Sequence, residues 1–232
     1  MKTILITGVN RGLGKELFNL FISKGYNVFG VLRNKHEAEK LKRGLSKNAK
    51  IILTDLSSDE SIESIQEVVK DHPVDLLINN AGISGNSSSI DEIESEEILR
   101  LINIHCLGAF RATKAIKANL LKTKNPVVIN LNSRLGSITR QSKGTYKHLA
   151  ISYSYRIAKA AQNMLTNCFK NEFNGSIKFI SVHPGKMKTE IASEDADVEA
   201  IDIANKILNA FENKELREEN GIIELGEQLI EW

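Results

Sequence analysis

The chain has 232 residues, of which 41% are hydrophobic and 26% charged, a composition typical of one globular domain with a full core. A net charge of +2 gives no electrostatic basis for nucleic acid or an anionic membrane as the main partner. No apolar run approaches the roughly 20 residues of a membrane helix, and Cys106 and Cys168 lack metal-ligand spacing, so we expect a cytoplasmic protein without a metal site.

Short apolar runs alternate with longer amphipathic ones along the whole chain. The predicted strands are residues 3–6, 27–32, 50–53, 74–78, 127–131, 177–182 and, more weakly, 222–225. The predicted helices are residues 12–23, 36–44, 59–70, 96–122, 155–173 and 198–211. Because strands that alternate with helices are joined by right-handed crossovers, we expect an α/β fold. It is a single domain over residues 1–232, a Rossmann-like doubly wound parallel sheet with helices on both faces.

A glycine-rich turn follows the first strand and leads into the first helix. It reads Thr7-Gly8-Val9-Asn10-Arg11-Gly12-Leu13-Gly14, with the spacing Gly-x-x-x-Gly-x-Gly. Glycine lets a backbone turn sharply and approach a pyrophosphate closely, and the helix N-terminus supplies N–H groups for the phosphates. In a chain of alternating strands and helices, this turn predicts a dinucleotide-binding site.

The end of the second strand indicates which dinucleotide binds. An NAD site usually carries an acid there for the ribose hydroxyls. Here the strand ends in Arg33 and Asn34, and no acid comes before Glu37. Arg33 is placed to meet a 2′-phosphate, with Arg11 within reach of the same group, because guanidinium binds phosphate in a fork. The sequence therefore favours NADP(H), and NAD(H) stays possible if these arginines are only solvated.

Among the four tyrosines, Tyr155 alone has a lysine four places on, Lys159. On a helix this spacing places both side chains on one face. A lysine ammonium beside a phenol stabilises the phenolate and lowers a pKa that is otherwise about 10. A tyrosine tuned in this way passes a proton to or from a substrate oxygen near neutral pH, so the pair predicts an acid–base site.

These motifs belong to an ordered set that closely resembles the short-chain dehydrogenase/reductases over essentially the whole chain. The set comprises Thr7-Gly8-x-x-x-Gly12-x-Gly14, Asp55, Asn79-Asn80-Ala81-Gly82, Asn103, Ser133, Tyr155-x-x-x-Lys159, Pro184-Gly185 and Thr189. Residues 132–137 and 153–161 and the ending Gly221…Gly226…Trp232 look like the C-factor and sniffer-type carbonyl reductase branch. The long separation between Ser133 and Tyr155, filled by the loop 138–152, is similar to what this branch carries.

The resemblance implies a role for each residue. Tyr155 is the acid/base and Ser133 hydrogen-bonds the substrate carbonyl. Lys159 also binds the nicotinamide ribose, while Asn103 holds a water that connects Lys159 to solvent as a proton relay. Asp55 meets the adenine and Thr189 the nicotinamide carboxamide. The residues expected to line the cofactor are Gly8, Asn10, Arg11, Gly12, Leu13, Gly14, Arg33, Asp55, Leu56, Asn80, Ala81, Gly82, Tyr155, Lys159, Pro184, Gly185 and Thr189.

Hydride addition to a carbonyl develops negative charge on oxygen, which the hydroxyls of Ser133 and Tyr155 would stabilise. We therefore expect an NADP(H)-dependent oxidoreductase of carbonyl reductase type, acting on a small carbonyl compound or on the matching alcohol. Two alternatives stay open: a C-factor-like signalling or regulatory dinucleotide-binding protein with secondary activity, and a 3-oxoacyl carrier-protein reductase. The family usually pairs subunits through the helices at 96–122 and 155–173, so we expect a homodimer or homotetramer.

Four further aromatic or imidazole side chains have no assigned chemistry. Tyr146 and Tyr153 lack a lysine four places on, and we expect packing roles, with substrate contact left open. His105 and His183 are expected to be packing or hydrogen-bonding residues.

Overall fold

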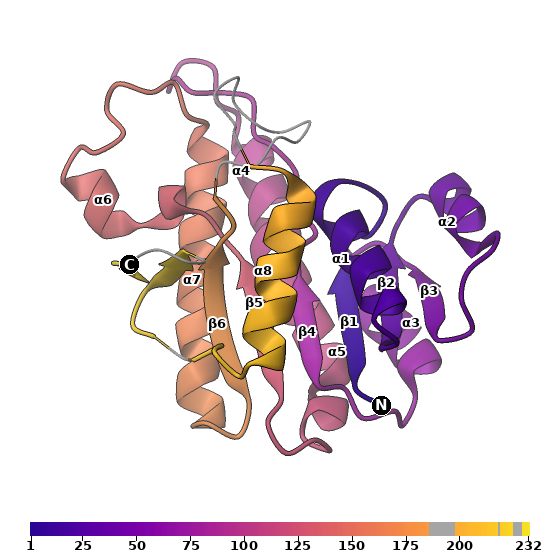
Figure 1. Ribbon diagram of the computed structural model, residues 1–232. Helices are drawn as coiled ribbons and strands as arrows, with labels where there is room; N and C mark the ends of the chain where they lie inside the picture. Colours follow the sequence, from indigo (N-terminus) through magenta and orange to yellow (C-terminus); the bar gives the residue numbers. More distant parts are fainter. Residues whose placement is uncertain (186–197, 218, 225–228) are drawn as a thin grey trace.

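The computed structural model describes residues 1–185, 198–217, 219–224 and 229–232. Within these residues eight strands form one sheet in the order β3-β2-β1-β4-β5-β6-β7-β8 (Figure 1). The strands are β1 Thr3–Thr7, β2 Asn27–Leu32, β3 Ala49–Leu53, β4 Leu76–Asn79, β5 Val127–Leu131, β6 Lys178–His183, β7 Ile222–Glu224 and β8 Leu229–Ile230. The predicted doubly wound α/β fold is therefore confirmed.

One end of the sheet departs from the all-parallel prediction. Every neighbouring pair of strands is parallel except β7 and β8, which run antiparallel with Ile222 opposite Ile230. The sequence did not indicate β8, because a strand of two residues is too short to form a recognisable apolar run.

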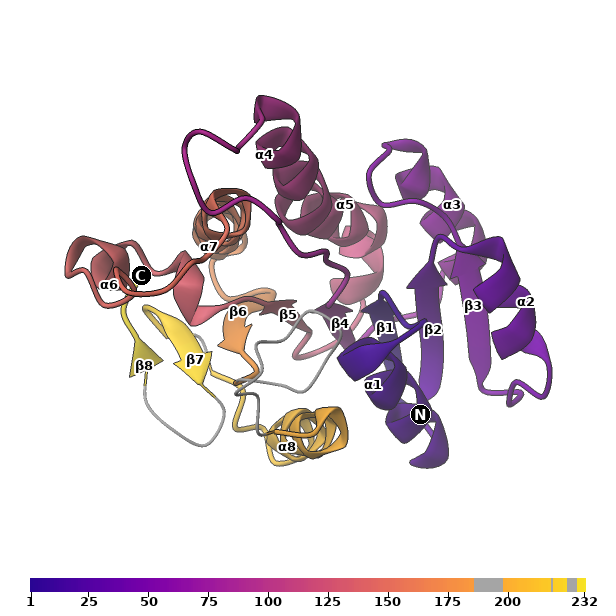
Figure 2. The ribbon, with the colours of Figure 1, turned by 90° about the horizontal axis from the view of Figure 1, so that it is seen from above.

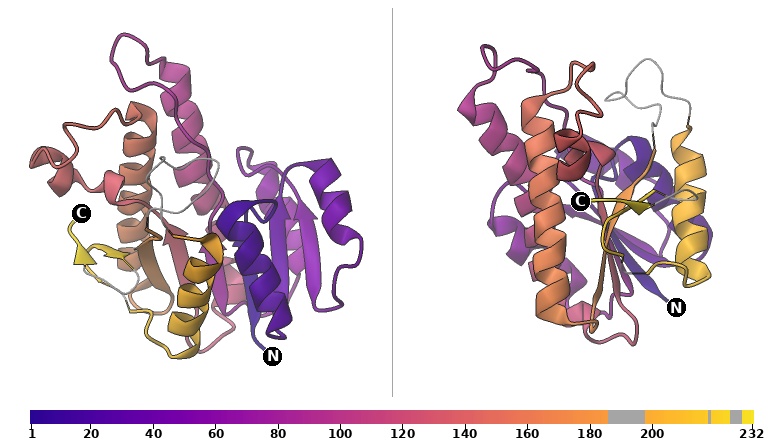
Figure 3. Two further views of the ribbon diagram at one scale, coloured as in Figure 1. Left: turned by 45° about the horizontal axis from the view of Figure 1, so that its top comes forward. Right: turned by 90° about the vertical axis from the view of Figure 1, so that its left-hand side faces the viewer.

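Helices cover both faces of the sheet. They are α1 Gly12–Ser23, α2 Lys35–Lys42, α3 Glu60–Val69, α4 Ser95–Ile102, α5 Gly108–Leu120, α6 Ile138–Ser142, α7 Tyr153–Phe173 and α8 Ala200–Glu212. Side chains of α1 and α8 pack on one face, and those of α3, α5 and α7 on the other (Figures 2 and 3). Because both faces are covered, all five residues of β1 are buried, and its three central residues form an apolar run without alternation.

The long helix predicted over residues 96–122 is broken in the structure. It consists of α4, a π-helical segment η1 at Asn103–Leu107, and α5, which is kinked at Ile116. A π-helical turn inserts an extra residue and rotates the side chains that follow it. From this segment, Ile104 and His105 line the cavity described below.

Helix α7 begins two residues earlier than predicted. The Ser152 hydroxyl caps it by accepting a hydrogen bond from the Tyr155 backbone N–H at 3.2 Å. Both Tyr155 and Lys159 therefore lie in the first two turns of a regular helix. Among the described helices, none is both long and apolar enough to cross a membrane.

Candidate active site

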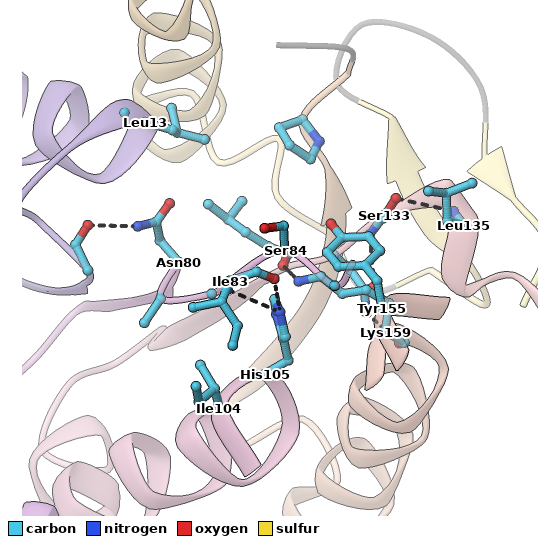
Figure 4. Close-up of a pocket in the computed structure, with 18 of the residues that line it drawn as sticks. Leu13, Asn80, Ile83, Ser84, Ile104, His105, Ser133, Leu135, Tyr155 and Lys159 are labelled. Atoms are coloured by element: carbon cyan, nitrogen blue, oxygen red, sulfur yellow. Dashed lines mark hydrogen bonds between the residues drawn. The ribbon is translucent and has the colours of Figure 1, made fainter. Parts of the chain in front are cut away.

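A large cavity opens at the carboxyl ends of the strands, with a volume of about 1730 Å³. Pockets for one small ligand are usually about 300–1,000 Å³, so this cavity has room for a dinucleotide and a second molecule. The strand order reverses direction between β1 and β4, and ligands of doubly wound sheets bind beside such a reversal. Figure 4 shows the residues that line its central part.

Most of the predicted site residues meet in this cavity. It is lined by Gly8, Asn10, Arg11, Gly12, Leu13, Arg33, Asp55, Leu56, Asn80, Ala81, Gly82, Ser133, Tyr155, Lys159, Pro184 and Gly185. Gly14 packs behind the lining, and Asn103 points elsewhere. Thr189 and Gly226 lie outside the described residues.

The glycine turn after β1 has the shape of a phosphate cradle. Gly8 and Gly12 adopt the left-handed region, with φ of +74° and +53°, which a side chain would strain. Arg11 stands at the N-cap of α1 without a side-chain cap hydrogen bond, and no acid lies in the first helical turn. The N–H groups and the positive end of the helix dipole are thus available to an anion, which fits the diphosphate of a dinucleotide.

Asn80 fixes this turn to the end of β4. Its side-chain amide donates to the carbonyl oxygens of Thr7 at 2.8 Å and Gly8 at 3.1 Å. The Thr7 hydroxyl in turn accepts from the backbone N–H groups of Asn80 and Ala81, both at 3.0 Å. A Cβ atom on Gly14 would overlap the Gly8 carbonyl and the Asn80 amide, so only glycine fits there.

Arg33 and Asp55 mark the far end of the cavity, after β2 and β3. The Arg33 side chain is 61% exposed, and its Nη1 lies 3.9 Å from Asp55 Oδ2. Partial burial favours the neutral form of Asp55, but a hydrogen bond from Ser57 and the charge of Arg33 outweigh it and lower the pKa of this carboxyl. An ionised Asp55 therefore stands beside an exposed guanidinium at the mouth of the cavity.

The hydroxyls of Ser133 and Tyr155 form the chemical centre of the site. Ser133 follows β5, and its Oγ accepts a hydrogen bond from Leu135 N at 3.2 Å. Burial raises the pKa of Tyr155 to about 12, while a hydrogen bond from the Ser133 hydroxyl acts in the opposite direction. Both side chains line the cavity, where each hydroxyl can donate a hydrogen bond to a substrate oxygen.

Lys159 lies buried beside Tyr155, with 5% of its surface exposed. Its Nζ donates to the carbonyl oxygen of Leu131 at 2.7 Å and to Gln162 Oε1 at 3.1 Å. The same atom lies 5.7 Å from the centre of the Tyr155 ring. Burial lowers the pKa of Lys159 to about 7, so its charge changes near neutral pH.

These pKa values correct one expectation. The spacing of Tyr155 and Lys159 predicted a phenol with a lowered pKa, and the structure gives a raised one. Desolvation of the phenol dominates, because the same burial also weakens the positive charge of Lys159. Tyr155 is therefore fully protonated at neutral pH, which suits a proton donor.

A network of amides holds Ser133 against α7. Asn132 Nδ2 donates to the Lys159 carbonyl at 3.2 Å, and Asn132 Oδ1 accepts from Ser133 N at 2.8 Å. Gly136 packs so closely on the backbone of Lys159 that its Cβ position would lie 2.8 Å from the Lys159 carbonyl carbon. The loop after β5 and helix α7 thus form one rigid unit.

The Asn103 side chain does not line the cavity, and its role in a proton relay stays a prediction. Its Nδ2 donates to the Ser57 carbonyl at 2.9 Å, and its Oδ1 accepts from Arg111 Nη1 at 2.7 Å. Arg111 also pairs with Asp59 and donates to the Leu56 carbonyl. The Asn103 side chain is therefore part of a hydrogen-bond network with Ser57 and Arg111.

His105, expected to be a packing or hydrogen-bonding residue, lies against Tyr155. Its ring meets the Tyr155 ring edge-on, with centroids 5.5 Å apart, and its Nε2 lies 2.8 Å from the Ile83 carbonyl (Figure 4). Burial and, secondarily, the charge of Lys159 lower the pKa of His105 to about 3. The imidazole is thus neutral, with Nδ1 unpartnered among the described residues. A Cβ at Gly82 would collide with this ring.

Tyr146 and Tyr153 differ in position. Tyr146 lines the cavity, whereas Tyr153 does not and stacks under the Arg156 guanidinium at 4.9 Å from its ring centre. Substrate contact therefore remains open for Tyr146 alone.

Comparison with known proteins decides the family. A family model for short chain dehydrogenases matches residues 2–200. The chain is a short-chain dehydrogenase. Short chain dehydrogenase gsfK of Penicillium aethiopicum is 30% identical over 207 residues, covering 84% of this chain and 80% of the relative. C-signal of Myxococcus xanthus is 31% identical over 142 residues, covering 60% of this chain and 81% of the relative.

Among solved structures, carbonyl reductase Sniffer of D. melanogaster covers the whole of both chains with a TM-score of 0.85 and 27% identity. Proteins of this oxidoreductase family bind a nucleotide cofactor, which fits the glycine turn of this chain.

The positions of His105 and Asn103 predict opposite outcomes for their replacement. His105→Ala removes the ring against which Tyr155 rests, so we expect turnover to fall about 10–100-fold.

Asn103→Ala removes a hydrogen-bond acceptor of the buried Arg111 guanidinium. We therefore expect a loss of about 1–3 kcal/mol in the free energy of unfolding, with turnover of the folded enzyme unchanged. Steady-state rates and urea unfolding of both variants test this. A large rate loss confined to Asn103→Ala would contradict this expectation and support the relay interpretation.

Proposed function

We propose that the protein is an NADP(H)-dependent carbonyl reductase that reduces a small ketone or aldehyde, or oxidises the matching alcohol. The observation that carries the proposal is the convergence of the Ser133 and Tyr155 hydroxyls, backed by Lys159, in the cavity that also holds the glycine turn. The full-length likeness to carbonyl reductase Sniffer supports a reductase of this type.

In the proposed reduction, the carbonyl carbon gains a hydride and the carbonyl oxygen gains a proton. Bound NADPH supplies the hydride. Ser133 and Tyr155 donate hydrogen bonds to the oxygen, which becomes more negative as the hydride arrives, so both bonds strengthen in the transition state. Tyr155 then gives its proton to the oxygen, a contribution of about 10²–10⁴-fold for such general acids.

Lys159 stabilises the phenolate that this transfer leaves behind. With a pKa of about 7, the amine is protonated in a substantial fraction of molecules near neutral pH. Its position beneath the Tyr155 ring allows the ammonium to offset the new negative charge. In the reverse direction, the same charge favours removal of a proton from an alcohol.

The charges near the mouth of the cavity favour NADP(H) over NAD(H). Arg33 is exposed there, and Arg11 belongs to the glycine turn. Asp55 is the only acid that lines the described cavity, and its pairing with Arg33 spans 3.9 Å, long for an ion pair. A 2′-phosphate would offer Arg33 a stronger, bidentate partner.

Tyr155→Phe tests the reaction directly. We expect kcat for NADPH-dependent reduction of activated carbonyls to fall about 10²–10⁴-fold, because the proton donor is lost. Affinity for NADPH should change little. Tyr153→Phe is the matched control, since this tyrosine lies on the same helix outside the cavity lining. Equal turnover by wild type and Tyr155→Phe would contradict the proposed chemistry.

Arg33→Asp tests the choice of cofactor. We expect wild type to bind NADPH more tightly than NADH and the variant to lose or reverse that preference, because an acid repels the 2′-phosphate. Titration of cofactor fluorescence gives both dissociation constants. Equal affinities in wild type would show that Arg33 is merely solvated.

A signalling role is the second candidate, because C-signal of Myxococcus xanthus is among the relatives. In that case the dinucleotide site would serve regulation, with catalysis secondary. Tight NADPH binding without turnover of any carbonyl in a broad panel favours signalling. Turnover that depends on Tyr155 favours the reductase.

We also propose a homo-oligomer paired through α4 and α7, which lie side by side (Figure 2). These helices expose large apolar side chains, Leu99, Ile157 and Met164. Light scattering of the purified protein tests the proposal. The mass of a single chain at micromolar concentration would contradict it.

A further inference from the structure

The substrate side of the cavity carries positive charge that the proposed reduction does not use. Beyond Ser133 this wall is built by the 3-10 turn η2 at Arg134–Gly136, by α6 and by the loop that leads to α7. Arg134 and Arg140 both line it and are half-buried. No aspartate or glutamate of the described residues lines this wall.

Neither guanidinium forms an ion pair with a carboxylate of the described chain. Arg140 Nη1 lies 3.4 Å from the Tyr146 hydroxyl, which donates to the Arg134 carbonyl at 3.4 Å. By contrast Lys143, on the outer side of the same segment, pairs with Glu231 at 2.9 Å. Arg134 and Arg140, which line the cavity, thus have no carboxylate partner among the described residues, whereas the exposed Lys143 has one.

The charges of both arginines also act on His183. His183, at the end of β6, lines the same space, and burial followed by the charges of Arg134, Arg140 and Lys159 lowers its pKa to about 3. Glu224 lies 3.5 Å from His183 Nε2 but does not line the cavity. On this side, therefore, no carboxylate of the described residues faces the cavity space.

This cationic pair is separate from the part that would hold cofactor phosphates. Leu13 and Asn80 lie at one side of the cavity, whereas Ser133 and Leu135 lie beyond Tyr155 at the other (Figure 4). Arg134 stands between Ser133 and Leu135 in the chain, so the pair belongs to the substrate side. Guanidinium binds carboxylates and phosphates through two parallel hydrogen bonds.

We infer that the substrate carries an oxyanionic group, a carboxylate or a phosphate, which Arg134 and Arg140 bind while Ser133 and Tyr155 hold the carbonyl oxygen. The inference rests on the proposed reductase function and deepens it by naming a substrate class. A partly enclosed cation pair without a lining acid attracts such a group and discriminates against neutral carbonyl compounds.

Matched aldehydes test this substrate class. We would compare kcat/KM for 4-formylbenzoate, 4-formylphenyl phosphate and neutral methyl 4-formylbenzoate with NADPH. The ester is the more electrophilic aldehyde, so intrinsic reactivity works against the expected preference. We expect at least one anionic aldehyde to exceed the ester about tenfold or more, as one charge-assisted hydrogen bond allows. The better anion distinguishes carboxylate from phosphate.

Variants assign the effect to the arginines. Arg140→Gln and Arg134→Gln should each lower kcat/KM for the anionic aldehyde about tenfold and leave the ester unchanged, and Arg140→Lys should restore part of the loss. Lys143→Gln, which removes an exposed paired cation of the same segment, should change neither substrate. Urea unfolding checks that each variant is folded.

Two results would overturn the inference while the reductase stands. One is equal kcat/KM for the anions and the ester in wild type. The other is an equal loss for both kinds of substrate in Arg140→Gln. If no aldehyde is reduced, the ester included, the proposed function fails instead. Calorimetric binding of 4-formylbenzoate in the presence of NADP⁺ then decides the inference: affinity lost in Arg140→Gln supports it, and unchanged affinity overturns it.

Discussion

The hydrogen bond from the buried Lys159 ammonium to the Leu131 carbonyl, at 2.7 Å, is the contact on which the site depends. It ties α7 to the last residue of β5. Tyr155 stands one turn before Lys159, and Ser133 comes two residues after Leu131, so this contact helps to set how the two hydroxyls meet. A buried amine without such acceptors would be strongly destabilising. Gln162 and the Asn132 network complete its support.

Burial rather than charge pairing then sets the protonation states around this lysine. Desolvation holds Tyr155 protonated and keeps His105 and His183 neutral, while it lowers the pKa of Lys159 to about 7. Lys159 thus changes its charge near neutral pH, whereas Tyr155, His105 and His183 do not. The positive charges of the cavity walls, with Asp55 as the only acid among the described lining residues, suit a polyanionic cofactor. A chain of nearly balanced charge is therefore locally polarised at its cavity.

Much of this arrangement is readable in the sequence, because a parallel sheet brings the residues after each strand to one edge. That rule assembles the glycine turn, Asn80, Ser133 and Tyr155 from distant positions. The hydrogen bonds of the Asn103 side chain could not be predicted in this way, since no pattern in residues 96–122 reveals the π-helical turn. The buried row Leu101, His105, Ala112 and Ile116 does have helical spacing and could have identified His105 as the inward residue. The raised pKa of Tyr155 could not be predicted, because the spacing of residues indicates which side chains are neighbours but not how deeply they are buried.

The most direct test of this account is the pKa of Lys159 in the folded protein. Nuclear magnetic resonance of protein with ¹³Cε-labelled lysine, with the signal assigned by its loss in Lys159→Arg, follows this amine alone as pH is varied. The account predicts a titration midpoint near 7. A midpoint at the ordinary value of 10.5 would mean that the ammonium is solvated and does not support Tyr155, and it would contradict the account.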